Sequence, residues 1–168
     1  GDATAGTAER GNLSLSAGRL VRTGAGSIEM AAGRDIQFAA ASGSNEAAMV
    51  YVAGRKMAGE SAVLRDLFAR QSAKPLFVEQ GGRLELNATR DLISSEATQL
   101  MNNWLWRSGL LSTPASAASL YSVFSQPAWW SEFSRFRQTL GSFGGGGLNL
   151  RAGRDIVNLQ AMAPTSGW

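Results

Sequence analysis

Two residue types are missing from this chain of 168 residues, cysteine and histidine. Without cysteine there is no disulfide framework and no thiol nucleophile. Without histidine, the common acid–base and triad chemistries lose their usual base, and zinc loses another of its main ligands. The acidic residues do not cluster as they do in a calcium-binding loop. The sequence therefore predicts no enzymatic activity, no metal site and no cofactor.

Proline is also scarce, since the chain has four prolines against 20 glycines. This balance suits many tight corners and not a disordered, proline-rich segment. No stretch has the features of a signal peptide or a membrane span. Because repeated sequence runs towards both ends, we expect the chain to be a segment of a longer polypeptide that does not itself span a membrane.

A short sequence motif recurs along the chain. Its clearest copies begin at Gly11, Gly26, Gly82 and Gly146, and a fainter copy runs from Met49 to Arg55. Each copy alternates apolar residues with variable ones, reaches an alanine and then continues with Gly-Arg, except that Thr89 replaces this glycine in the Gly82 copy. Alternation indicates a strand with one buried face, and its recurrence indicates units that stack on one another.

The repeated motif predicts which side chains share a face. We expect interior rows that align the first apolar residue of every copy, namely Leu13, Ile28, Met49, Leu84 and Leu148. The corner glycines, Gly18, Gly33, Gly54 and Gly153, are expected to adopt the positive φ that glycine alone takes at little cost.

These features predict a mainly β fold, a right-handed parallel β-helix (solenoid) with α-helical insertions. The whole chain, 1–168, is expected to form a single segment of this β-helix. The first apolar residues of successive copies lie 15, 21, 35 and 64 residues apart. The interval of 21 suits one coil of a repeat fold, the interval of 15 requires a lean coil or two neighbouring faces of one coil, and the two longer intervals require insertions. A β-sandwich is the alternative, although it does not need the same corner at every repeat.

Most basic residues are arginines, and the net charge is +3. Three corner arginines precede an aspartate, giving the pairs Arg34-Asp35, Arg90-Asp91 and Arg154-Asp155. We expect each aspartate to bracket its turn and each arginine to pair with an acid of an adjacent coil. Because no run of like charges marks a phosphate groove, the sequence predicts no binding of nucleic acid.

Two stretches interrupt the strand pattern. Apolar residues at three- and four-residue spacing predict a short helical insertion at 60–72 and a larger, aromatic-rich helical insertion at 96–143. The larger one is expected to hold one helix that includes Leu100, Met101, Trp104 and Leu105, and a second from about Pro127 to Leu140. Ser125 is the expected cap of the second helix and Gly141 its stop.

The larger insertion holds four of the five tryptophans, Trp104, Trp106, Trp129 and Trp130. Packing of this insertion along the β-helix explains them without any ligand. Alternatively they form a recognition surface for a protein or a glycan, because tryptophan favours interfaces and offers a flat face to sugar rings. The second interpretation makes the chain a glycan-binding or polysaccharide-degrading β-helix domain that uses the aromatic insertion.

The Ala-Gly-Arg-Asp-Ile corners, together with Trp129-Trp130 and the segment from Leu140 to Ile156, resemble the large filamentous-haemagglutinin-type exoproteins of bacterial two-partner secretion. The resemblance is to a module in the C-terminal region of these exoproteins. It implies secretion through an outer-membrane transporter, by way of the periplasm, to the surface of a Gram-negative bacterium or beyond it. It also implies a virulence role as a rigid spacer in adhesion or in contact-dependent inhibition by toxin delivery, with surface glycans or proteins of host or neighbouring cells as partners.

Overall fold

The computed structural model describes residues 11–40, 47–56, 78–96, 98–108 and 128–164. Over these residues the protein is mainly β, and its larger sheets are parallel. The described residues contain no α-helix, and their helical structure is one 3-10 turn, η2 at Met101–Asn103. The helix predicted at 60–72 lies outside the described residues.

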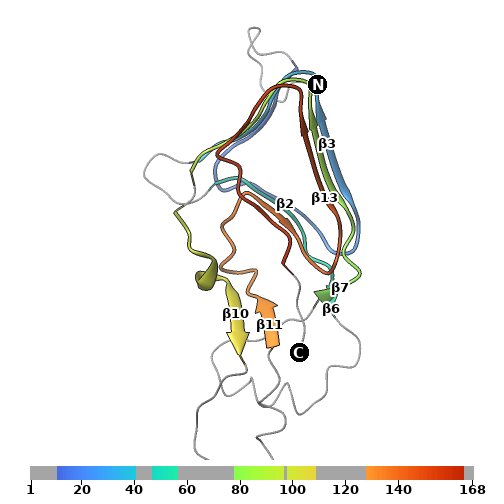
Figure 1. Ribbon diagram of the computed structural model, residues 1–168, viewed down its shortest axis with the longest axis vertical. Coiled ribbons are helices and arrows are strands. Elements are labelled where there is room, and N and C mark those ends of the chain that lie inside the picture. The colour runs from blue at the N-terminus through green and yellow to red at the C-terminus, as the bar shows by residue number, and fades with distance from the viewer. Residues whose placement is uncertain (1–10, 41–46, 57–77, 97, 109–127, 165–168) are drawn as a thin grey trace, which may run out of the picture.

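Three parallel sheets contain most of the strands (Figure 1). The first sheet consists of β1 (Leu13–Leu15), β4 (Ile36–Phe38), β9 (Leu92–Ser94) and β14 (Ile156–Val157). The second consists of β2 (Leu20–Thr23), β5 (Met49–Val52), β12 (Leu140–Ser142) and β15 (Ala161–Met162). The third consists of β3 (Ile28–Ala32), β8 (Leu84–Ala88) and β13 (Leu148–Ala152).

The chain visits these sheets in rotation, from the first to the second to the third and back again. In Figure 1 the strands lie along the three sides of a triangle, and successive passes of the chain follow the same outline. The antiparallel hairpins that a β-sandwich would form between β1 and β3 are not present, because each of these strands pairs in parallel with another strand.

Two short antiparallel pairs lie outside these sheets. β6 (Arg55–Lys56) pairs with β7 (Val78–Glu79), and β10 (Leu105–Ser108) pairs with β11 (Ala128–Ser131). Each pair brings together two segments that are well separated in the sequence, β6 with β7 and β10 with β11. Figure 1 shows β10 and β11 below the side of the triangle that contains β2.

The core lies inside the triangle and follows the predicted alternation best in the third sheet. Ile28, Leu84 and Leu148 are in register, and Leu84 and Leu86 are fully buried. The main cluster of buried residues combines all three sheets, with members that include Ile36, Phe38, Val50, Val52, Leu92 and Leu140. The alignment of one interior row from the repeated motif is therefore confirmed for these three copies.

The same prediction is wrong for Leu13 and Met49. Leu13 pairs with Ile36 in the first sheet, so the Gly11 copy corresponds to the Arg34-Asp35-Ile36 corner and not to the Ile28 strand. In β5 the main core is filled by Val50 and Val52, whereas Tyr51 packs in a second cluster on the other face. Because β5 is buried on both faces, its apolar run carries no alternation that identifies the inner one.

The helices predicted within 96–143 are also wrong over the described residues. Leu100 and Met101 are exposed, and the chain passes from η2 directly into β10. The stretch expected to be helical from Pro127 contains β11 and then separate turns, in which Arg135 bonds to the Glu132 carbonyl and Phe136 to the Phe133 carbonyl. An isolated turn with an i to i+3 hydrogen bond brings together residues that are three apart, as one turn of a helix does. The spacing of apolar residues therefore did not distinguish such turns from a helix.

The corner glycines serve two different purposes. Gly18 and Gly54 have positive φ, of 70° and 77°. Gly33 and Gly153 do not, so the prediction is wrong for them. At Gly153 the requirement is space, because a Cβ atom would overlap the carbonyl oxygen of Thr89 on the adjacent corner.

Candidate functional site

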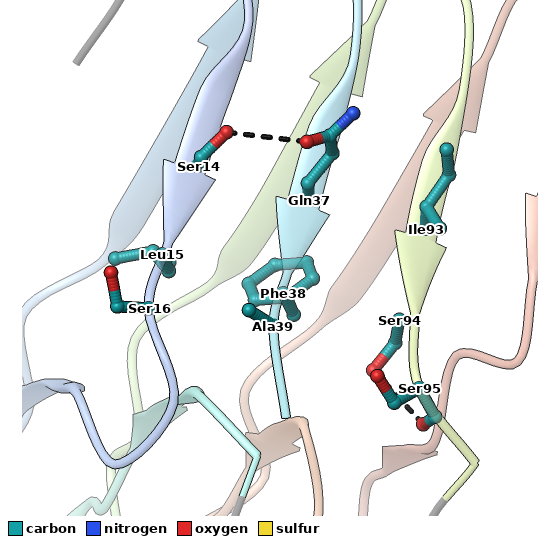
Figure 2. A pocket seen from close by; sticks show the side chains of 9 residues that line it. All are labelled: Ser14, Leu15, Ser16, Gln37, Phe38, Ala39, Ile93, Ser94 and Ser95. Atoms are coloured by element: carbon teal, nitrogen blue, oxygen red, sulfur yellow. Dashed lines mark hydrogen bonds between the residues drawn. The ribbon is translucent and has the colours of Figure 1, made fainter. Parts of the chain in front are cut away.

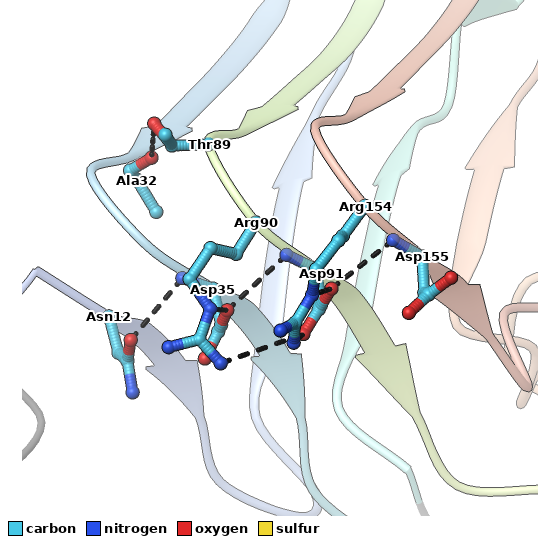
Figure 3. A network of polar contacts seen from close by, with 8 residues as sticks. All are labelled: Asn12, Ala32, Asp35, Thr89, Arg90, Asp91, Arg154 and Asp155. Carbon is cyan, nitrogen blue, oxygen red and sulfur yellow. Dashed lines mark hydrogen bonds and ion pairs between the residues drawn. The ribbon is translucent and has the colours of Figure 1, made fainter.

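A ladder of polar side chains runs along the corner between the third and first sheets (Figure 3). Asn12 Oδ1 accepts a hydrogen bond from the Asp35 N–H at 3.3 Å, and Asp35 Oδ1 accepts one from the Asp91 N–H at 3.3 Å. Asp91 Oδ1 accepts the third, from the Asp155 N–H at 3.2 Å. We call Asn12, Asp35, Asp91 and Asp155 the corner ladder.

Arginines reinforce the corner ladder from the following strand. Arg90 Nε lies 3.5 Å from Asp35 Oδ1, and Arg154 Nε donates to Asp91 Oδ1 at 3.0 Å while its terminal nitrogen contacts Asp91 Oδ2. Both Asp35 and Asp91 are 5% exposed. The pairing of corner arginines with acids of an adjacent strand, expected from the sequence, is therefore present. Asp91 is bonded through both of its carboxylate oxygens and Asp35 through Oδ1, so each buried carboxylate holds neighbouring strands together.

The hydrogen bond from Arg154 holds the pKa of Asp91 below its ordinary value of 3.8, against the opposing effect of burial. The Asp155 N–H and the charges of Arg154 and Arg90 act in the same direction. Arg154 has a raised pKa for the reciprocal reason. The Asp91 carboxylate is thus ionised whenever the protein is folded near neutral pH.

We expect Asp91→Asn to remove a pH-dependent part of the stability. Because the folded-state pKa is lowered, this contribution is complete above the unfolded-state pKa near 3.8 and is lost as pH falls through the folded value. Urea unfolding at pH 7 and in acid should therefore show the wild type more stable than the variant at pH 7, with the two converging in acid. Asp155→Asn is the matched control, and an equal pH dependence in both variants would contradict the assignment.

A second cluster of aromatic rings covers the outer face of the second sheet. Tyr51 stacks on Phe133 with a centroid distance of 5.5 Å, and Trp104 meets Phe136 edge to face at 4.9 Å. Phe143 lies edge to face against both Phe133 and Phe136. These offset and T-shaped contacts are the favoured geometries for aromatic pairs. The insertion is thus anchored on the sheet by its aromatic residues.

The four tryptophans singled out in the sequence do not form one exposed surface. Trp104 is 0% exposed and Trp130 is 2% exposed, so neither offers a face to a ligand. Trp106 lies opposite Trp130 in the β10–β11 register, and Trp129 lies opposite Arg107. The prediction of a stacking platform is therefore wrong for Trp104 and Trp130, while the side chains of Trp106 and Trp129 lie outside the described part of the structure.

A pocket of about 310 Å³ opens beside the aromatic cluster. Its lining includes Leu20, Met49, Tyr51, Phe133 and Arg137. The Arg22 guanidinium lies 5.7 Å from the centroids of both the Tyr51 and the Phe133 rings, within the range of a cation–π contact. Burial raises the pKa of Tyr51, and the charges of Arg22 and Arg137 oppose that shift.

A second pocket, of about 260 Å³, lies at the ends of β1, β4 and β9 (Figure 2). Its lining combines apolar side chains with neutral polar ones. The apolar ones include Leu15, Phe38 and Ile93, and the polar ones include Ser14, Ser16, Gln37 and Ser95. Ser14 donates to Gln37 Oε1 at 3.3 Å across two strands. None of the nine lining residues carries a charge, so this pocket offers hydrogen bonds but no acid–base group.

Sequence reasoning missed Asn12, Arg22 and Tyr51. Asn12 immediately precedes Leu13, as Asp35 precedes Ile36. Aligning Leu13 with Ile36, in the strand that follows the corner, would therefore have identified Asn12. Arg22 and Tyr51 are brought together by the pairing of β2 with β5. No local pattern in the sequence marks that pairing.

Comparisons of the chain with protein-family models, with curated proteins and with solved structures gave no match. In the part of the chain that the structure describes, no helix has the length and apolar character needed to cross a membrane.

Proposed function

We propose that this chain is a non-enzymatic structural segment of a secreted, filamentous-haemagglutinin-like exoprotein. In this proposal the three parallel sheets are the faces of a right-handed parallel β-helix that acts as a rigid spacer. The right hand is the expected one, because parallel strands of one sheet are joined by right-handed crossovers in almost all proteins.

The corner ladder is the observation that carries the proposal. It repeats one side-chain bond along four strands that are separated by 23, 56 and 64 residues in the sequence. It therefore keeps the strands in line although the intervening segments differ greatly in length. Each of the two buried aspartates is bonded to a neighbouring strand, and this favours a mechanical role over a catalytic one.

The aromatic cluster supports the same interpretation. Gly141 lies in β12 directly under the rings, and a Cβ atom there would come within 2.5 Å of the Phe143 ring and 3.0 Å of the Phe136 ring. The sheet and the insertion are thus fitted to each other at a buried surface. We infer that the insertion is a cover for this side of the β-helix, with export by an outer-membrane two-partner transporter and display at the cell surface.

The spacer proposal is tested by a search for ligands. Labelled protein applied to an array of host and bacterial glycans is expected to bind none of them, and tryptophan fluorescence should not change on titration with polysaccharides. Saturable binding would contradict the spacer and favour the rival, a glycan-binding domain. In that case Trp106→Ala or Trp129→Ala should abolish it, since Trp104 and Trp130 are buried.

Buried Trp104 provides a control for that experiment. Trp104→Ala removes a ring that contacts Phe136 and Phe143, so it should lower the stability by about 3–5 kcal/mol, as for large aromatic residues in cores. Thermal unfolding separates this effect from ligand binding. A melting temperature equal to that of the wild type would mean that Trp104 does not anchor the insertion.

A further inference from the structure

The corner ladder is complete at three of its positions and open at the fourth. Asn12, Asp35 and Asp91 each accept an N–H from the ladder residue of the next strand. Asp155 is exposed, and its carboxylate accepts no hydrogen bond from any residue that the structure describes. Figure 3 shows this carboxylate at the end of the row.

The backbone follows the same series. The N–H groups of Leu13, Ile36 and Leu92 donate to the carbonyl oxygens of Asp35, Asp91 and Asp155, at 2.8, 2.9 and 2.9 Å. Ile156 occupies the fourth place in this series, so its N–H is directed towards the position of one more strand.

The apolar residues at this edge are uncovered. Ile156 is 51% exposed, whereas Ile36 and Leu92, which occupy the same row, are both 0% exposed. Leu148 is only half-buried, although its partner Leu84 is fully buried. The edge formed by β13, β14 and β15 thus carries apolar residues of the kind found in the core, but at this edge they are exposed or only half-buried.

The opposite edge differs in charge. There the corner ladder begins with the neutral Asn12, which is preceded by Gly11 and not by an arginine. The two edges are therefore not complementary, because a second copy docked head to tail would place Gly11 where Asp155 requires a cation.

We propose that the edge of β13, β14 and β15 binds one further coil of parallel strands, supplied in the same polypeptide, whose ladder residue is directly preceded by arginine. The N–H of that ladder residue donates to Asp155 Oδ1, the arginine pairs with the Asp155 carboxylate, and the following aliphatic residue covers Ile156. This inference rests on the stacked architecture of the proposed function and adds the chemistry that the next coil must carry.

The test extends the full chain after Trp168 by a second copy of residues 146–168, which contains Arg-Asp-Ile at the required positions. The extended protein should melt several degrees higher than one extended by a scrambled version of the same residues. Amide exchange at Ile156 should slow by about tenfold or more.

Two substitutions then isolate the ladder contact. Asp155→Asn should lower the melting temperature of the extended protein but not of the original chain. Replacing the arginine of the added copy by glycine, as at Gly11, should have the same effect, and combining both changes should add little more. This non-additivity is the signature of a direct contact.

The proposal is overturned if the added copy stabilises no better than its scrambled control, or if its effect is insensitive to Asp155→Asn. It is also overturned if the original chain forms dimers or fibres that Ile156→Lys abolishes, because the occupant would then be a second copy. The pH dependence of Asp91→Asn reports on an internal position of the corner ladder, so it separates failure at this edge from failure of the stacked architecture itself.

Discussion

Leu86→Asp is expected to abolish cooperative folding of the chain. Leu86 is 0% exposed and lies in register between Met30 and Leu150, on strands that flank it in the third sheet. The substitution loses about 2 kcal/mol of apolar burial and leaves a carboxylate without a partner in the core, which costs several kcal/mol more. Since a domain of this size has a net stability of about 5–15 kcal/mol, little or none would remain.

Glu85→Lys is the matched control for this substitution. Glu85 is the preceding residue in β8, is half-buried on the outer face and pairs with Arg83 at 3.2 Å. Its register neighbour in β3 is Glu29, so a lysine loses the Arg83 ion pair and the hydrogen bond from Asn87 but replaces a like-charge contact with an opposite-charge one. We expect a cost below about 1 kcal/mol. Circular dichroism melts of both variants check the prediction, and equal melting temperatures would refute the assignment of the faces.

Gly146→Ala is expected to destabilise the chain by forcing two backbone segments apart. A Cβ atom at Gly146 would overlap the carbonyl oxygen of Gly82, where the segments leading into β13 and β8 run against each other. Backbone atoms cannot move aside as a flexible side chain can. The strands must separate locally, and we expect a loss of about 2–3 kcal/mol, in the range of severe overpacking.

Gly147→Ala tests the same chemical change one residue away. Among the described residues its Cβ atom would meet only the Arg83 side chain, at 3.9 Å, and its φ is not positive. This variant should be neutral, or slightly more stable because alanine restricts the unfolded chain. Urea denaturation of the pair measures the difference. If both variants unfolded at the same urea concentration, the close approach of the two segments would not be a determinant of stability.

The predictability of this fold from sequence depended on how many faces of a strand are buried. The alignment of Ile28, Leu84 and Leu148 in the third sheet was predicted correctly, because the motif beginning at Gly26, Gly82 and Gly146 alternates apolar and variable positions. β5 was assigned to the wrong row because both of its faces are buried, one by the core and the other by the aromatic cluster. Alternation is informative only where one face meets water.

The aromatic insertion was mispredicted for a different reason. Its apolar residues do recur at a spacing of three and four. However, they lie in single turns and not in a helix, and their packing partner Tyr51 comes from a strand distant in sequence. The arginine–aspartate contacts of the corner ladder were predicted because arginine and aspartate are adjacent in the sequence. The participation of Asn12 depends on strand register, which local composition does not specify.

The unequal spacing of the corner ladder has a consequence for how such a chain acquires new parts. Closing a loop of 64 residues instead of 23 costs only about 0.9 kcal/mol more in chain entropy, because the cost grows with the logarithm of length. Burying one leucine returns about twice that amount. Lengthening the connections that leave β6 or β9 is therefore thermodynamically cheap as long as the chain returns to the same corner, so these two exits are the natural places to graft or exchange a domain.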